Sequence, residues 1–304
     1  MYKEYEKCML CPRECKVNRN IGEIGICGMT GNVYAARASL HKWEEPCLSG
    51  SDESRGAGTV FFTGCNMGCV YCQNFVISNC ETKGKEVTVN RLTDIFFELE
   101  QKGAYNIDLV TPTHFMPTIK AAIEKAKNRG ISVPFVYNTG GYEKTECIKE
   151  LDGLIDIYLP DFKYFDNDIS GKYSGVQDYF QCASEALDEM VRQCRVPEFD
   201  ESGEIMKKGV IVRHLVLPGN VGDSKNVVKY IYETYGDSVF ISIMNQYTPV
   251  RKIPDYPQLN RKLTKEEYDS VVDYAIEIGV ENGFVQEGDT AEESFIPLFE
   301  CEGI

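Results

Sequence analysis

The stretch GCNMGCVYCQN, residues 64–74, places Cys65, Cys69 and Cys72 within eight residues. It follows an apolar run at 59–63 that is typical of a buried β-strand, so the cysteines lie in a loop at the carboxyl end of that strand. Three thiolates at this C-x3-C-x2-C spacing can bind three corners of one iron–sulfur cluster and leave the fourth iron open. A structural zinc site would need a fourth ligand from elsewhere in the chain. Loop cysteines without a metal are the remaining alternative.

Three neighbours of these cysteines fit a bound cluster. Gly64 and Gly68 carry no side chain, so the backbone can approach a cluster closely. Tyr71 lies in the second spacer, where its ring can cover the cluster from water. The local sequence therefore favours an iron–sulfur cluster over the two alternatives.

The chain beyond this loop alternates strand-like and helix-like segments. Apolar runs typical of strands occur at 59–63, 107–111, 133–138, 155–160, 210–217 and 239–244, and helical patterns occur at 92–102, 118–129, 143–151, 178–194, 224–235 and 264–279. Six successive strand–helix units predict an α/β fold with parallel strands and right-handed crossovers. The site of such a sheet lies at the carboxyl ends of its strands. Length alone does not separate an open sheet from a barrel, and neither glycine-rich nucleotide motif is present.

The composition is that of an ordinary globular protein, with 43% hydrophobic and 26% charged residues among 304. The net charge of −15 would repel a nucleic acid, so no nucleic-acid partner is expected. No run approaches the roughly 20 apolar residues that span a bilayer, and the first ten residues do not resemble a signal peptide. The sequence therefore predicts a cytoplasmic protein that is not in a membrane. Its 13 cysteines are an odd number and fit a secreted disulfide framework poorly.

Four further cysteines lie close together near the amino terminus. Cys8, Cys11, Cys15 and Cys27 belong to a segment without a long periodic pattern, and a polar stretch at 49–58 follows it. We therefore expect a cysteine-rich module over residues 1–50 and a catalytic domain over residues 55–304. Four thiolates form a closed ligand set that suits structural zinc or an auxiliary iron–sulfur cluster that relays electrons. Zinc is slightly favoured, because a site far from the barrel needs no open iron; a metal-free module is the third alternative.

The module also contains the chain's one tryptophan. Trp43 is followed by Glu44, Glu45 and Pro46. Because a tryptophan ring buries a large apolar area wherever it docks, we expect Trp43 to pack the module down. The alternative is that it covers the cluster loop.

The sequence CNMGCVYC resembles the signature of the radical S-adenosylmethionine superfamily, in which C-x3-C-x-aromatic-C follows the first strand of a partial barrel. The resemblance implies a partial (β/α)6 TIM-like barrel. It also implies a 4Fe-4S cluster at Cys65, Cys69 and Cys72, whose open iron binds S-adenosylmethionine. One electron from the reduced cluster then cleaves the cofactor, and the resulting 5′-deoxyadenosyl radical abstracts a hydrogen atom. The cofactor supplies the difficult chemistry, and the protein positions the substrate.

Other strand ends resemble the branch that activates glycyl radical enzymes, in the motifs YNTGG, YLPDFK and RHLVLPG at 137–141, 158–163 and 213–219. By this resemblance Lys163 binds the S-adenosylmethionine carboxylate. Asp161, Asn138 and Thr139 line a polar floor beside it, and Arg213 meets the carboxylate or the substrate. The alternative for Asp161 and Lys163 is a surface ion pair on a loop.

One motif departs from that branch. The activases carry Gly-Gly-Glu-Pro after the second strand, where it receives the cofactor's amino group, whereas this chain has Thr111, Pro112, Thr113 and His114. The hydroxyl and carbonyl oxygens of Thr111 and Thr113 can still accept hydrogen bonds from an ammonium group. His114 is a candidate for substrate contact or acid–base catalysis, and packing in the interior is its alternative.

The full pattern is similar to a pyruvate formate-lyase activating enzyme-like branch whose members also carry the amino-terminal CMLCPREC motif. It implies a radical S-adenosylmethionine oxidoreductase that takes hydrogen from a protein or peptide, with a flavodoxin- or ferredoxin-type reductant. An alternative is radical epimerisation or cross-linking of a peptide or small metabolite. A non-catalytic metal-binding or electron-transfer scaffold is the alternative outside enzymes.

Overall fold

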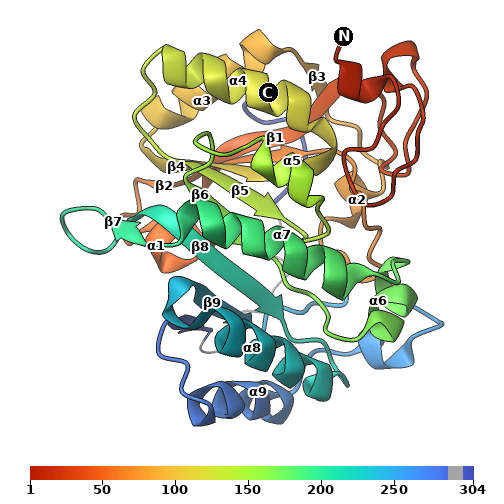
Figure 1. Cartoon of the computed structure of the whole chain (residues 1–304), viewed down its shortest axis with the longest axis vertical. Coiled ribbons are helices and arrows are strands. Elements are labelled where there is room, and N and C mark those ends of the chain that lie inside the picture. The colour runs from red at the N-terminus through yellow and green to blue at the C-terminus, as the bar shows by residue number, and fades with distance from the viewer. Residues whose placement is uncertain (287–296) are drawn as a thin grey trace.

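A computed structural model describes residues 1–286 and 297–304 of the chain, and its centre is one open mixed β-sheet (Figure 1). The strands follow the order β10-β9-β8-β6-β5-β4-β2-β1-β3, and β7 pairs with β8 off this path. Their bounds are β1 Val33–His41, β2 Gly56–Phe62, β3 Lys85–Val87, β4 Ala104–Val110, β5 Phe135–Thr139, β6 Ile157–Pro160, β7 Glu198–Phe199, β8 Met206–Leu215, β9 Phe240–Met244 and β10 Gly283–Val285.

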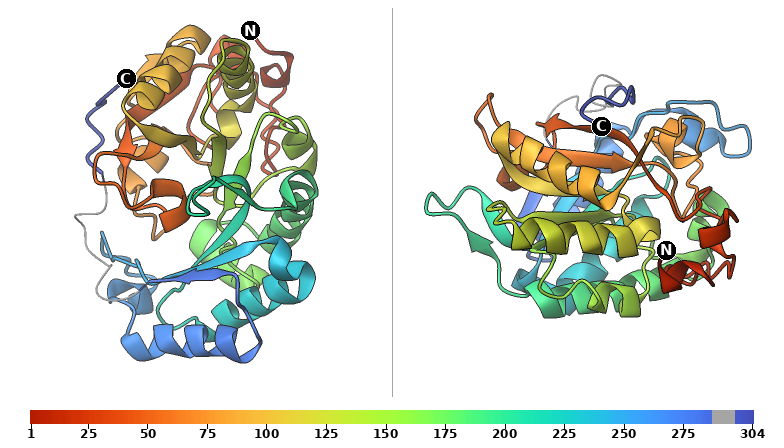
Figure 2. Two further views of the ribbon diagram at one scale, coloured as in Figure 1. Left: turned by 90° about the vertical axis from the view of Figure 1, so that its left-hand side faces the viewer. Right: turned by 90° about the horizontal axis from the view of Figure 1, so that it is seen from above.

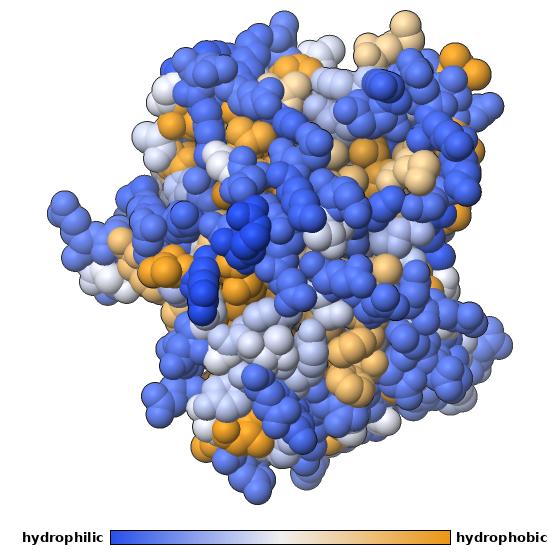
Figure 3. Space-filling model, viewed as in Figure 1, coloured by the Kyte–Doolittle hydropathy of each residue, from blue (hydrophilic) through white to orange (hydrophobic). Residues whose placement is uncertain are grey.

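The α-helices lie mostly on one face of this sheet, in front of the strands in Figure 1. Their bounds are α1 Pro46–Ser49, α2 Phe75–Ser78, α3 Val89–Gln101, α4 Met116–Asn128, α5 Thr145–Lys149, α6 Asn167–Ser174, α7 Tyr179–Cys194, α8 Val221–Tyr235 and α9 Lys265–Glu277. Short 3-10 turns cover Lys3–Tyr5, Arg19–Ile21, Thr113–Phe115, Gly236–Ser238 and Pro257–Asn260. The outer surface of the helices is mostly hydrophilic (Figure 3), as the acidic composition requires.

The parallel part of the sheet is confirmed as predicted. Strands β2, β4, β5, β6, β8 and β9 pair in parallel in chain order, and they match the six predicted apolar runs. Helices α3, α4, α5, α7, α8 and α9 match the six predicted helical patterns. The sheet does not close, so the fold is the partial barrel that was expected.

Local sequence explains why these elements form. Every residue of β2 and β5 is buried, which fits strands covered on both faces. Helix α9 begins with a capping box, in which the side chains of Thr264 and Glu267 each accept from the other's backbone amide. Helix α4 has proline in its first turn, and Gly130 follows it with φ of 86°.

Strand β1 was missed in the sequence. It lies inside residues 1–50 and pairs antiparallel with β2, so this part of the module belongs to the sheet. The polar stretch at 49–58 is likewise only partly a connector, because β2 begins at Gly56. Small residues explain the miss: Ala35, Ala36 and Ala38 are buried in β1 but give little apolar signal.

The carboxyl ends of the parallel strands face the side where α2 and the amino-terminal segment lie (Figures 1 and 2). Among the described residues, no helix is long and apolar enough to span a bilayer.

Candidate active site

Cys65, Cys69 and Cys72 lie together in the loop that follows β2 and line a cavity of about 130 Å³. Each sulfur has a hydrogen-bond donor. The Met67 amide lies 3.5 Å from Cys65 Sγ, Ser174 Oγ lies 2.9 Å from Cys69 Sγ, and Ser78 Oγ lies 3.4 Å from Cys72 Sγ. Such donors stabilise the thiolate form, which is the form that binds metal.

The donor set fits the three-cysteine cluster. Burial, together with the neighbouring Cys69 and Cys72, raises the pKa of the Cys65 thiol to about 12. Three adjacent, partly buried thiolates therefore need a positive group between them, which the irons of a cluster would supply. Within residues 1–286 and 297–304, no three His, Cys, Asp or Glu side chains are arranged to hold a single metal ion. The cysteines of an iron–sulfur cluster bind different irons, so they need not converge on one point.

A larger cavity of about 670 Å³ adjoins the first. The residues that line both are Cys69, Cys72, Asn74, Val110, Asn138, Asp161, Lys163 and Arg213. They come from the loop after β2 and from the carboxyl ends of β4, β5, β6 and β8. The strand ends thus meet at one place, as expected for a parallel sheet.

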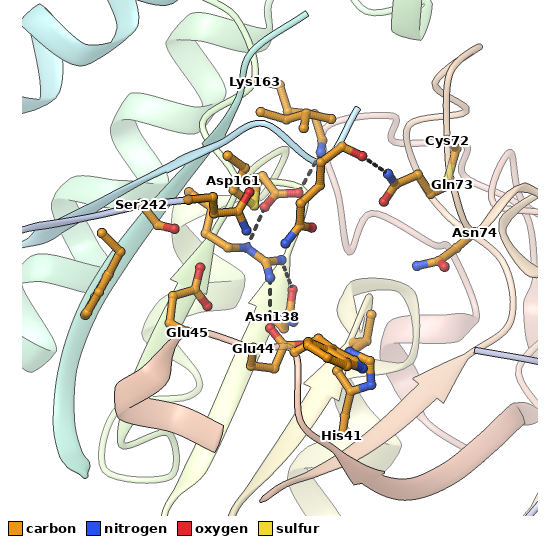
Figure 4. A pocket seen from close by; sticks show the side chains of 18 of the residues that line it. His41, Glu44, Glu45, Cys72, Gln73, Asn74, Asn138, Asp161, Lys163 and Ser242 are labelled. Atoms are coloured by element: carbon orange, nitrogen blue, oxygen red, sulfur yellow. Dashed lines mark hydrogen bonds and ion pairs between the residues drawn. The ribbon is translucent and has the colours of Figure 1, made fainter. Parts of the chain in front are cut away.

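Arg213 connects three parts of the larger cavity, and its partners Asp161, Glu44 and Asn138 are labelled in Figure 4. Its Nε donates to Asp161 Oδ1 at 2.9 Å, its Nη1 to Glu44 Oε2 at 3.0 Å and its Nη2 to Asn138 Oδ1 at 2.6 Å. Burial alone would lower the pKa of Arg213, but the surrounding carboxylates outweigh this effect and raise the pKa above its usual value. The guanidinium therefore stays charged. Arg213 therefore fixes the positions of Asp161, Glu44 and Asn138.

Lys163 and Asp161 form an ion pair within the cavity, where Nζ lies 2.6 Å from Oδ2. The exposed fractions of their side chains are only 16% and 20%. Burial raises the pKa of Asp161, but the charges of Lys163 and Arg213 outweigh this and lower it. The pair is therefore not the exposed surface pair that was the alternative.

Thr111 lines the smaller cavity in a strained conformation. Its φ is 58°, which is rare for a β-branched residue, and its amide donates to the Asn138 carbonyl at 2.8 Å. Thr139 also lines this cavity. These two threonines lie beside the cysteines, whereas Thr113 lines neither cavity.

Glu143 was not singled out in the sequence. It is buried, and the hydroxyls of Thr113 and Thr139 both donate to its Oε1. Its Oε2 has no hydrogen-bond partner among the described residues. Burial raises the pKa of Glu143 to about 7, although the two hydroxyl donors act in the opposite direction. A glutamate two residues after the double glycine Gly140–Gly141 was the available signal.

His114 lines neither cavity. Its ring is buried, and Nε2 lies 2.7 Å from the Thr63 carbonyl oxygen. Burial and the charge of Arg19 lower its pKa to about 3, so the ring is neutral at pH 7. This placement corresponds to the packing alternative and gives no route to substrate contact.

The four amino-terminal cysteines lie directly behind the cluster loop. Cys8, Cys11 and Cys27 are buried, and a Cβ built on Gly25 would lie 3.4 Å from the Sγ atoms of both Cys15 and Cys27. The premise that they lie far from the barrel is wrong. A Cβ on Gly64 would lie only 2.6 Å from the Cys27 carbonyl oxygen, so the distance argument for zinc no longer holds.

The position of Trp43 also differs from its predicted role in packing the module down. It does not pack into the interior: 58% of the residue is exposed, and it lines the larger cavity. Glu44 and Glu45, which follow it, line the same cavity. The cavity therefore includes acidic side chains that the strand-end motifs did not indicate.

Known proteins give three informative comparisons, although no protein-family model matches the chain. The uncharacterized protein MJ0674 of Methanocaldococcus jannaschii is 29% identical over 279 residues, which are 89% of this chain and 75% of that protein. The pyruvate formate-lyase-activating enzyme of Staphylococcus epidermidis is 24% identical over 204 residues, which are 64% of this chain and 74% of that enzyme.

Among solved structures, HydG, a maturase of the FeFe-hydrogenase, superposes with a TM-score of 0.50 and 13% sequence identity. The match covers 76% of this chain but only 52% of HydG, so the chain spans about half the length of that structure. At this identity the likeness concerns the fold alone. In its cysteine loop and its sequence the chain is thus similar to radical S-adenosylmethionine enzymes of the pyruvate formate-lyase-activating type, and its fold is similar to that of HydG.

Proposed function

We propose that this protein binds a 4Fe-4S cluster through Cys65, Cys69 and Cys72, binds S-adenosylmethionine beside it, and removes a hydrogen atom from a substrate. The observation that carries the proposal is the shared lining of the two cavities: the cysteine loop and Lys163 meet at the same strand ends. When bound and reduced, the cluster supplies the electron that cleaves S-adenosylmethionine to the 5′-deoxyadenosyl radical.

The chain's own residues then bind the cofactor. Lys163 and Arg213 are buried cations beside the cysteines, and both can receive the cofactor carboxylate. The oxygens of Thr111 and Thr139 face the smaller cavity and can accept from the cofactor ammonium group. Asp161 holds both cations in place through its two carboxylate oxygens.

Tyr71 would keep water from the cysteines. It is 6% exposed, and its hydroxyl lies 2.7 Å from that of Tyr164, which in turn lies 2.7 Å from Ser174 Oγ. Ser174 is the residue that donates to Cys69. A buried chain of hydroxyl groups thus ends on a cysteine sulfur, which supports exclusion of water around a reactive radical.

A protein or peptide substrate is supported by the shape of the larger cavity. Trp43, 58% exposed at this cavity, can contact a partner, because exposed tryptophans often anchor interfaces. Activating enzymes among the sequence relatives suggest a partner enzyme as the substrate. A small metabolite is the second candidate, since a cavity of about 670 Å³ also holds small molecules.

The amino-terminal cysteines would hold a second metal, zinc or an iron–sulfur cluster. Their position behind the cluster loop supports either a structural role for that loop or electron delivery from a flavodoxin- or ferredoxin-type reductant. Metal analysis of the wild type and of Cys11→Ala separates zinc from a second cluster.

Formation of 5′-deoxyadenosine tests the proposal. Protein purified without oxygen is reduced with dithionite, supplied with S-adenosylmethionine and followed by mass spectrometry. The wild type should form 5′-deoxyadenosine, Cys69→Ala should not, and Cys182→Ala should match the wild type, because Cys182 lines neither cavity. Equal product from Cys69→Ala, or none from the wild type with a loaded cluster, would contradict the proposal.

A further inference from the structure

Glu45 is a buried acid with one carboxylate oxygen that has no hydrogen-bond partner among the described residues. It precedes α1, is 7% exposed and lines the larger cavity. Figure 4 shows its side chain among those that line this space, on the same side as Ser242. Its Oε2 has no hydrogen-bond partner among the residues that the structure describes. Neighbouring Glu44 differs, because it accepts from Arg213 at 3.0 Å.

The cations of the cavity are already engaged elsewhere. Arg213 donates to Asp161, Glu44 and Asn138, and Lys163 donates to Asp161. The ammonium group of Lys42 donates to the backbone carbonyl of Glu53. None of these three side chains donates a hydrogen bond to Glu45. A cofactor carboxylate would use further N–H groups of Lys163 and Arg213.

Asp108 is a third acid, near enough to Glu44 for the two charges to act on each other. Asp108 is fully buried in β4, accepts from Asn138 Nδ2 at 3.3 Å and has a free Oδ1 among the described atoms. Burial and the charge of Glu44 raise the pKa of Asp108 well above its usual range, whereas the charge of Arg213 acts in the opposite direction. Among the acids that line the larger cavity, Glu44 and Asp161 accept from Arg213, whereas Glu45 keeps a carboxylate oxygen without a hydrogen-bond partner among the described residues.

A buried ionised carboxylate without a partner is costly, so it takes up a proton or a positive ligand. Burial raises the pKa of Glu45, which favours uptake of a proton when no ligand is bound. The second case needs a ligand that reaches the larger cavity, where the rings of Trp43 and Phe284 can also contact a cation. Glu45 does not line the smaller cavity beside the cysteines, so the cofactor's own ammonium group, bound at the cluster, is not the ligand.

We propose that the substrate presents a positively charged nitrogen, a primary ammonium or a guanidinium group, to Glu45. This proposal rests on the function proposed above and names the substrate class of the same site. The nitrogen belongs either to a lysine or arginine side chain of a peptide or to a small amine, and in both cases N–H groups donate to Glu45 Oε2.

The test measures binding to protein loaded with cluster and S-adenosylmethionine, by calorimetry at pH 7.5. The probes are N-acetyl-lysine methylamide, N-acetyl-arginine methylamide and cadaverine, and N-acetyl-norleucine methylamide is the uncharged analogue. Trp43 is the one tryptophan of the chain, so its fluorescence reports whether a probe enters the larger cavity. The variants are Glu45→Gln and, as a matched control, Glu53→Gln, whose exposed residue does not line the cavity.

At least one charged probe should bind the wild type and change the Trp43 fluorescence, and the norleucine analogue should bind about 10-fold more weakly or not at all. Glu45→Gln should lose about 10-fold or more in affinity for the charged probe, and Glu53→Gln should keep it. Tighter binding of a blocked amino acid than of cadaverine assigns the nitrogen to a peptide, and the reverse assigns it to a small amine.

Three results would overturn the proposal: no charged probe binds, the norleucine analogue binds as tightly as the charged probes, or Glu45→Gln weakens the binding of S-adenosylmethionine itself. The last would make Glu45 part of the cofactor site. Formation of 5′-deoxyadenosine by the wild type is measured on the same sample. Its failure would contradict the proposed function, whereas normal product without amine binding would contradict only the substrate class.

Discussion

Arg13 Nε lies 2.8 Å from the Asn66 carbonyl oxygen, and through this contact the cysteine-rich module is bonded to the loop that carries Cys65. The same guanidinium donates to Met67 at 2.8 Å and to Gly175 at 2.7 Å. One side chain between Cys11 and Cys15 thus holds the backbone around the central cysteines. The two cysteine groups are therefore coupled by direct contacts.

Arg13→Ala should disturb the central cluster although Arg13 is not a ligand. Loss of hydrogen bonds to Asn66, Met67 and Gly175 should lower the free energy of unfolding by about 2 kcal/mol. It should also broaden the electron paramagnetic resonance signal of the central cluster. Arg13→Lys should rescue little, because one ammonium group cannot span these carbonyls. Arg129→Ala is the control, since it removes an exposed pair with Asp94. An unchanged signal with unchanged stability would refute the coupling.

Lys163→Ala should weaken S-adenosylmethionine binding by about 1–3 kcal/mol, because a buried cation beside the cysteines is lost. Asp161 keeps its bond to Arg213, so the fold should persist. The affinity is measured by calorimetry on cluster-loaded protein. Lys172→Ala on the exposed side of α6 is the control. Equal affinity for both variants would remove Lys163 from the cofactor site.

Glu143→Gln should stabilise the protein more at pH 8 than at pH 5. The folded pKa of Glu143 is raised to about 7 by burial, so its favourable contribution is complete below its usual pKa of 4.5 and is lost as the pH rises through 7. Glutamine does not titrate and keeps an acceptor for Thr113 and Thr139. The difference should grow by up to about 3 kcal/mol between these pH values. Urea unfolding measures it.

The exposed Glu146 on α5 gives the control, since Glu146→Gln should show no such trend. A stability difference for Glu143→Gln that is constant with pH would mean that Glu143 does not titrate in this range.

The metal of the amino-terminal cysteines is measured by iron, sulfide and zinc analysis of protein purified without oxygen, with Cys11→Ala as the comparison. If the site holds zinc, Cys11→Ala should lose zinc and stability while the iron content stays the same. If it holds a second cluster, the variant should lose about half of the iron. No loss of either metal would mean that these cysteines bind none.

The central site could be predicted because its information is local. Cys65, Cys69 and Cys72 lie in one loop after a strongly apolar strand, and parallel strands bring their carboxyl ends together, so Asp161 and Lys163 were expected nearby. The sheet itself followed from regular alternation of apolar runs and helical patterns.

The acidic part of the cavity could not be predicted in the same way. Glu44 and Glu45 follow β1, which pairs antiparallel with β2 and places His41 opposite Ala57, so they reach the larger cavity from the amino end of β2. Strand β1 is rich in alanine and gave no clear pattern, so its place in the sheet was missed. The contact of Arg13 with Asn66 joins segments 53 residues apart, and no local pattern contains that information.

The most direct test of the central claim is electron paramagnetic resonance of dithionite-reduced protein before and after addition of S-adenosylmethionine, in the wild type and in Cys69→Ala. The wild type should show the signal of a reduced 4Fe-4S cluster, and this signal should change on addition of the cofactor. Cys69→Ala should lack the signal. A wild-type protein that retains iron but whose spectrum does not respond to S-adenosylmethionine would contradict the central claim.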